Sequence, residues 1–179
     1  MTALAIISDV EASLGRSLTA AETTRATSLL ILASAHVEAE TGYRFAPGSY
    51  TVGRKVREDK VRLPASVATV AAVRAVDQSN GSVTVLTGFT SRQRTVYGLS
   101  ACFVEVDFTV TEPVPVEVVG IVAGTVASTM AGPPAGAASE SAGPFSISYV
   151  NSSGKVWLSA SDKAILRRYK QAKPALDLL

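Results

Sequence analysis

The chain has 179 residues, of which 47% are hydrophobic and 18% are charged, and its formal net charge at pH 7 is +2. A chain of this length and composition can bury a core of its own, which excludes a protein that is disordered throughout. The small net charge does not indicate a protein that follows phosphates along one strongly basic face, so any role near DNA must be local or geometric.

The segment from Ser8 to Gly15 is predicted to form a short helix. Ser8 and Glu11 have the spacing of a capping box, and Gly15 tolerates the left-handed conformation that commonly ends a helix. The preceding run, MTALAII, carries no charge and is shorter than the apolar core of a signal peptide. We therefore expect a chain that is not exported.

A long helix is predicted between Thr19 and Gly42. Thr19 and Glu22 form a second capping box, and Gly42 supplies the stop. Leu32 and Ala35 widen the apolar side, which must be covered by this chain or by another copy of it. The apolar residues that recur at helical spacing are Ala26, Leu29, Leu30, Ala33 and Val37. The charged residues expected on the solvated flank are Arg25, Glu38 and Glu40.

The middle of the chain, about residues 50–110, is predicted to be a small antiparallel β module. Tyr50–Val56 and Lys60–Leu63 are expected to form a hairpin around Glu58 and Asp59. Val67–Asp77 is interpreted as a strand on its valine content, although its valines also fit a period near three.

The second half of this module has a firmer turn signal. Asn80-Gly81 lies between Val76 and an alternating valine pair, which favours a hairpin. Further strands are predicted at Gly88–Tyr97 and Cys102–Val110. The residues of the last strand that should face the core are Val104, Val106, Phe108 and Val110, and those that should face outward are Glu105, Asp107 and Thr109.

A second core helix is predicted after Pro115, which can occupy its first turn. Gly120 and Gly124 are expected to make a thin, close-packing face. The apolar run Val118–Met130 is shorter than the ~20 residues that a helix needs to cross a bilayer, so we expect no membrane role. The residues expected in the core are Val116, Val119, Val122 or Ala123, Val126 and Met130.

Residues 131–144, AGPPAGAASESAGP, are of low complexity and predict a flexible linker. Phe145, Ile147 and Tyr149 then alternate with serines, as in a strand that needs a partner edge. Ser159 or Ser161 is expected to cap a last helix. The predicted class is α+β, with residues 1–130 as a helical core containing the β module and residues 145–179 as an extended docking arm.

No enzyme is predicted. His36 is the single histidine, and its position inside the long helix favours a residue beside the packed face or at an interface over a catalytic base. The sequence has no nucleophile elbow and no phosphate-binding glycine loop. One histidine and Cys102, the single cysteine, are too few for a zinc site, so no metal or cofactor is expected. A hydrolase would need a pocket that brings His36 against a serine or Cys102, and we interpret Cys102 as a small buried side chain in a strand.

A single cysteine excludes an internal disulfide and is typical of a reducing compartment. Trp157 stands between a predicted turn and the last helix, and it either fills a pocket of a partner or packs on the chain's own sheet. Two basic clusters could contact phosphates or an acidic partner, or could simply be solvated. The first comprises Arg54, Lys55, Arg57, Lys60 and Arg62, and the second Arg167, Arg168, Lys170 and Lys173.

Four stretches together resemble the head-tail connector (adaptor) proteins of long-tailed bacteriophages. They are DVEASLGRSLTAAE, LLILASAHVEAETGYRF, GAASESAGPFSISY and LSASDKAILRRYK. The shared pattern is a short helix, a capped long helix ending in a Thr-Gly pair before an aromatic residue, and a Ser-Glu-Ser segment followed by aromatic alternation. The resemblance covers both ends of the chain, and the segment Thr51–Val110 matches only in being rich in β structure.

The resemblance implies a virion protein that is assembled in the host cytoplasm as a ring, commonly of twelve copies. Such a ring joins the portal to a stopper or tail component, and DNA passes through it without sequence recognition. The candidates for contact with the portal are Trp157, Ile165, Leu166, Arg167, Arg168 and Tyr169. The candidates for the ring interface are Leu29, Leu32 and His36, and those for the channel or an acidic partner form the first basic cluster. The alternative hypothesis is a small nucleic-acid-binding module that uses the basic clusters.

Overall fold

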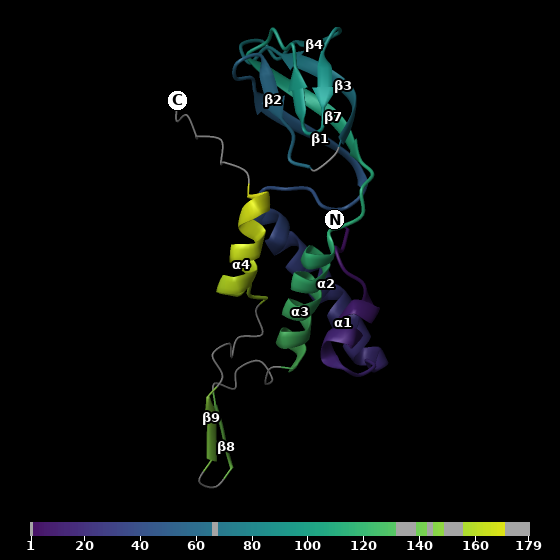
Figure 1. The fold of residues 1–179 in the computed structure, drawn as a ribbon, viewed down its shortest axis with the longest axis vertical. Helices are drawn as coiled ribbons and strands as arrows, with labels where there is room; N and C mark the ends of the chain where they lie inside the picture. Colours follow the sequence, from purple (N-terminus) through teal and green to yellow (C-terminus); the bar gives the residue numbers. More distant parts are fainter. Residues whose placement is uncertain (1, 66–67, 132–138, 143–144, 149–155, 171–179) are drawn as a thin grey trace. The chain divides into compact units, whose positions relative to one another are not determined.

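The structure, a computed structural model, describes residues 2–65, 68–131, 139–142, 145–148 and 156–170. The chain divides into two compact units, each considered by itself (Figure 1). A helical unit combines Met1–Thr41 with described residues that follow Val114, and a β unit is formed by Gly42–Val114. The predicted α+β class, with a core of N- and C-terminal helices, is confirmed.

The described residues of the helical unit form four α-helices, in which α3 packs against both α1 and α2, and α4 packs against α2 (Figure 1). A short hairpin, β8–β9, lies between α3 and α4 in the sequence. The helices are α1 (Ile7–Leu14), α2 (Ala20–Thr41), α3 (Val116–Ala131) and α4 (Ala160–Leu166), the last continued by the 3-10 turn η1 (Arg167–Tyr169).

Both predicted ends of α2 are confirmed. The backbone N–H of Thr19 donates to Glu22 Oε2 at 2.9 Å, and Gly42 has the left-handed φ of +65° that ends the helix. All five residues predicted at helical spacing are buried in the core. Two expectations for the flanks are wrong: Glu38 is buried, and Leu32, predicted to extend the packed side, is 51% exposed.

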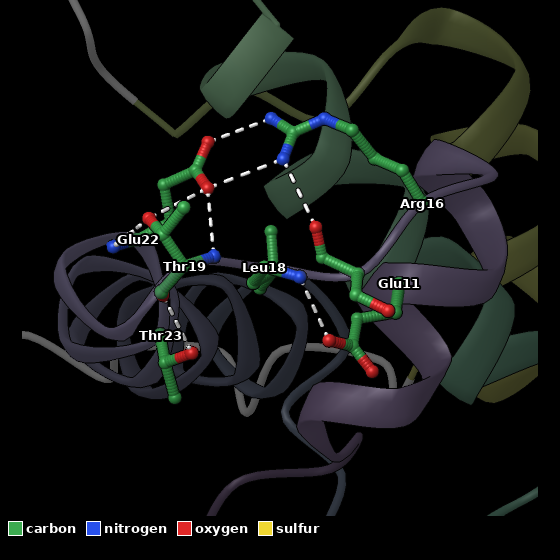
Figure 2. Close-up of polar contacts among 7 residues, drawn as sticks. Glu11, Arg16, Leu18, Thr19, Glu22 and Thr23 are labelled. Atoms are coloured by element: carbon green, nitrogen blue, oxygen red, sulfur yellow. Dashed lines mark hydrogen bonds and ion pairs between the residues drawn. The ribbon is translucent and has the colours of Figure 1, made fainter.

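A polar junction fixes the passage from α1 into α2 (Figure 2). The backbone N–H of Leu18 donates to Glu11 Oε1 at 2.8 Å, and the Arg16 guanidinium donates to both Glu22 oxygens, at 3.1 and 2.6 Å. The Arg16 hydrogen bond, helped by two hydrogen bonds from Thr19, lowers the pKa of Glu22 to about 2.

The predicted capping box of α1 is wrong in its members. Asp9, not Glu11, caps the helix by accepting the N–H of Ile6 at 2.8 Å, and Ser8 lies inside the helix. Gly15 ends the helix with a φ of +68°, as predicted.

The helix α3 is apolar on nearly every side, and its buried face matches the predicted one in part. Val122, Ala123 and Val126 are buried, as predicted. Val116, expected in the core, is 84% exposed, whereas Val118 and Ile121 are buried. The predicted close packing at Gly120 and Gly124 is also wrong, because a Cβ at either position would meet nothing within 4 Å. Among the residues that the structure describes, no helix is both long and apolar enough to cross a membrane.

The β unit has two antiparallel sheets that share one core. The first has the order β1-β7-β3-β4 and the second β2-β6-β5. The strands are β1 (Gly48–Lys55), β2 (Lys60–Arg62), β3 (Ala68–Val76), β4 (Val83–Val85), β5 (Thr90–Arg92), β6 (Thr95–Tyr97) and β7 (Phe103–Val110).

The central strand β7 has the predicted alternation, and its four inward residues are buried. The turn at Asn80-Gly81 joins β3 to β4 with Val76 opposite Val83, as predicted. The predicted strand Gly88–Tyr97 is two strands, β5 and β6, because Gln93 adopts a left-handed φ of +49° and reverses the chain. Cys102 precedes β7 and is exposed, so its predicted burial in a strand is wrong.

The predicted hairpin of β1 and β2 is wrong beyond its turn. Glu58 and Asp59 do reverse the chain, with left-handed φ values of +51° and +54° and paired backbone hydrogen bonds between Arg57 and Lys60. The two strands then separate, since β1 pairs with β7 in the first sheet and β2 pairs with β6 in the second.

The region predicted as a linker contains β8 (Ser139–Ala142), which pairs antiparallel with β9 (Phe145–Ser148). The alternating segment therefore has its partner edge inside the predicted linker. Residues 132–138 and 143–144 of the predicted linker lie outside the described residues, and so does Tyr149.

Phe108 is the side chain whose loss should damage the β unit most. It is 1% exposed, and its ring centroid lies 5.7 Å from that of Tyr50. We expect Phe108→Ala to lower the free energy of unfolding by about 3–5 kcal/mol, because it removes apolar contacts and leaves a cavity. Urea unfolding followed by circular dichroism measures this loss, and the exposed Val85→Ala should change the same quantity by no more than about 0.5 kcal/mol.

Candidate functional site

The candidate site is the surface that the C-terminal helix presents on the helical unit. Ser159 caps α4, since its Oγ accepts the Asp162 N–H at 3.1 Å while Asp162 Oδ2 accepts the Ser159 N–H at 2.9 Å. Leu158 and Leu166 are buried, and Leu166 is only 1% exposed. These contacts dock α4 on its own unit.

A polar clamp made by Glu117, Arg168 and Tyr169 holds the end of this segment. The carboxylate of Glu117, in the first turn of α3, accepts hydrogen bonds from the Tyr169 hydroxyl and the Arg168 guanidinium. Lys170 Nζ adds an ion pair of 2.8 Å to Glu40 Oε1 on α2. The clamp therefore joins residues more than fifty positions apart in the sequence.

The clamp shifts the proton affinities of its members in opposite directions. The hydrogen bond from Tyr169, followed by a backbone hydrogen bond and the charge of Arg168, lowers the pKa of Glu117. Burial, together with the hydrogen bond to Glu117, raises the pKa of Tyr169. The charged carboxylate and the neutral phenol are thus the forms that the fold favours.

Beside the clamp, α4 and the segment that leads into it expose two large apolar side chains. Trp157 is 62% exposed, with Lys163 Nζ lying 4.8 Å from the centre of its ring. Ile165 is exposed too, whereas Leu166 is buried in the core of the unit. Of the residues predicted to contact the portal, the exposed ones are Trp157, Ile165, Arg167 and Arg168, and Tyr169 is half-buried.

A second exposed apolar surface lies on α2. Ile31 and Leu32 are exposed, and His36, one turn after Leu32, is exposed as well. Leu29, predicted with them at a ring interface, is buried in the unit's own core. The sequence reasoning missed Ile31, although its place beside Leu32 in the same apolar run signals it.

The first basic cluster does not form one surface. Arg54 and Lys55 point to opposite faces of β1, and burial lowers the pKa of the half-buried Arg54. Lys60 Nζ lies 2.6 Å from Glu58 Oε2. Arg62 is exposed, two residues further along β2.

Two of the residues considered for catalysis belong to different units. His36 is exposed on α2, and Cys102 belongs to the β unit. Within the described ranges, no group of three or more His, Cys, Asp or Glu residues is placed to hold a metal ion.

Comparisons with known proteins give a likeness in fold. No family model and no curated protein sequence matches the chain. Two solved structures match it over 94% of its length and 90% of theirs, at 22% sequence identity. One is the neck of an empty gene transfer agent (GTA) particle, computed with C6 symmetry (TM-score 0.58), and the other is the virion of a native GTA particle (TM-score 0.59). The chain therefore shares its fold with a chain of each of these particles.

The clamp predicts a pH dependence. Because the pKa of Glu117 is below its ordinary 4.5, its contribution to docking of α4 is complete above that value and is lost as the pH falls through the lowered pKa. Amide hydrogen exchange in α4, corrected for the intrinsic effect of pH, should therefore speed up in acid.

Glu117→Gln should remove this acid dependence and speed up exchange in α4 at neutral pH. Glu58→Gln is the matched control, since Glu58 also has a lowered pKa but lies in the β unit. Unchanged exchange in Glu117→Gln would show that the clamp does not hold α4.

Proposed function

We propose that the chain is a head-to-tail adaptor of a phage neck, a structural protein that joins the portal to the next stopper or tail component. The observation that carries this proposal is the likeness to GTA neck and virion chains, which spans both units rather than one motif. The resemblance of both ends of the sequence to phage connector proteins points the same way.

The proposed assembly is a ring of twelve copies through which DNA passes. The similar neck was computed with C6 symmetry, and a ring with a multiple of six copies is compatible with that choice. The exposed Ile31 and Leu32 on α2 support contact between copies, because a heterologous contact that closes produces a ring. Burying these side chains against a neighbour would complete the coverage that the single chain leaves open.

The proposed contact with the portal is the exposed surface of α4. Trp157 and Ile165 offer large apolar side chains, and aromatic anchors of this kind dominate the binding energy of many interfaces. Arg167 adds an exposed charge for a partner with carboxylates. Removing the whole segment would expose the core under Leu158 and Leu166, so its role is best tested by surface substitutions.

Assembly of the ring is tested by placing a charge on α2. Leu32→Glu should prevent copies from associating, because the carboxylate would lose its water at the interface without a partner. Native mass spectrometry of the protein alone and after mixing with portal should show rings for the wild type and single chains for the variant. Val85→Glu, at an exposed valine of the β unit, is the control, and rings that form equally well with Leu32→Glu would contradict the proposed interface.

Attachment is tested with Trp157→Ala combined with Ile165→Ser. We expect this variant to fold normally, because both side chains are exposed, and to stop co-sedimenting with portal-bearing heads. Ile6→Ser, which alters another exposed apolar residue of the same unit, should attach like the wild type. Normal attachment of the double variant would rule out this surface as the portal contact.

A further inference from the structure

The outer face of the β2-β6-β5 sheet gathers three cations that are dispersed in the sequence. Arg62 on β2 and Arg92 on β5 both lie opposite Thr95 of the middle strand β6. Directly paired residues of an antiparallel sheet share a face, so the two arginines flank this threonine. With strands about 4.8 Å apart, their backbones are about 10 Å from each other.

The next row of the same face repeats the pattern. Lys60 on β2 and Thr90 on β5 lie opposite Tyr97 of β6, which is 40% exposed. Val61 and Val96, which alternate with these residues, are buried in the shared core. The sheet therefore keeps its apolar side for the core and directs cations and hydroxyl groups into solvent.

The two arginines keep their charge available, unlike Arg74 of the first sheet. Arg74 makes a bidentate contact with Asp107, at 2.5 and 2.8 Å, and approaches Glu105 at 3.6 Å. In the part of the chain that the structure describes, no carboxylate pairs with Arg62 or Arg92. Lys60 differs from the two arginines, because its Nζ lies 2.6 Å from Glu58 Oε2. The segment Gly42–Val114 as a whole has nine Lys and Arg against six Asp and Glu.

We propose that this face, formed by Lys60, Arg62, Thr90, Arg92, Thr95 and Tyr97, binds the sugar-phosphate backbone of duplex DNA without reading its bases. Arginine, lysine, threonine and tyrosine side chains all donate hydrogen bonds to phosphate oxygens, and such contacts carry no direct sequence information. An acidic protein is a poorer fit, because protein interfaces have an apolar centre and this face has one exposed aromatic side chain.

The choice of duplex DNA as the ligand rests on the proposed function, in which a ring surrounds the genome. Two arginines and a lysine that already pairs with Glu58 give weak binding by a single chain, and a ring would multiply the number of contacts on one duplex. Weak contact with phosphates alone suits DNA that must move past the protein.

Fluorescence anisotropy with the full-length protein and a labelled duplex of mixed sequence tests the proposal, with titrations at several salt concentrations from 20 mM upward. We expect binding that weakens with salt and is the same for an unrelated duplex. Arg62→Gln combined with Arg92→Gln should lower affinity several-fold and reduce the slope of log affinity against log salt by about 1.8, since each phosphate contact contributes about 0.9.

The control is Arg25→Gln on α2, which also removes an exposed arginine and should bind DNA like the wild type. Its DNA affinity is compared with those of the single variants Arg62→Gln and Arg92→Gln. The proposal is overturned if the duplex does not bind, if the double variant keeps the wild-type slope, or if polyglutamate of equal charge competes as well as unlabelled duplex. Attachment to portal-bearing heads is measured separately with the same double variant. If the double variant loses DNA affinity but attaches normally, both proposals are supported. If the wild-type protein fails to attach, the adaptor function is refuted, and the DNA-binding result is then judged by itself.

Discussion

The structure depends on the burial of α3, a helix that carries no charged residue between Glu117 and its end at Ala131. Such a helix is unstable in water unless other elements cover it, and in the helical unit α1 and α2 provide that cover. The covering helices precede the β unit in the sequence and α3 follows it. The core of the helical unit is therefore assembled from two distant stretches, one before and one after the β unit.

The same constraint decides which surfaces remain for partners. One side of α2 is buried in the core, and Ile31 and Leu32 remain exposed. Leu158 and Leu166 are also buried, whereas Trp157 remains exposed. The clamp at Glu117 fixes α4 against the unit, so its exposed residues form a prepared surface. A partner that binds there does not have to order a free segment first, which favours tight attachment.

Local signals in the sequence predicted local structure well. The capping residues Thr19 and Glu22 and the terminal Gly42 mark α2 because each acts on backbone groups a few positions away. The separation of β1 from β2 was not predictable in this way. The turn between them was predicted correctly, but each strand pairs with a strand far along the chain. Glu38, which is buried, and Val116, which is exposed, show the same limit, because their exposure depends on where a distant helix packs. The basic cluster was found by adjacency in sequence, but only the register of β5 and β6 reveals that Arg92 joins Arg62.

One pairing in the first sheet bears on how such a chain could diversify. Gly48, where β1 starts, lies directly opposite Val110, where β7 finishes. The start of the first strand and the end of the last strand of the β unit are thus neighbours in space. A domain with adjacent ends can be enlarged, trimmed or exchanged for another insert without stretching the polypeptide that carries it. The helical scaffold can accordingly keep its geometry when the inserted domain is changed.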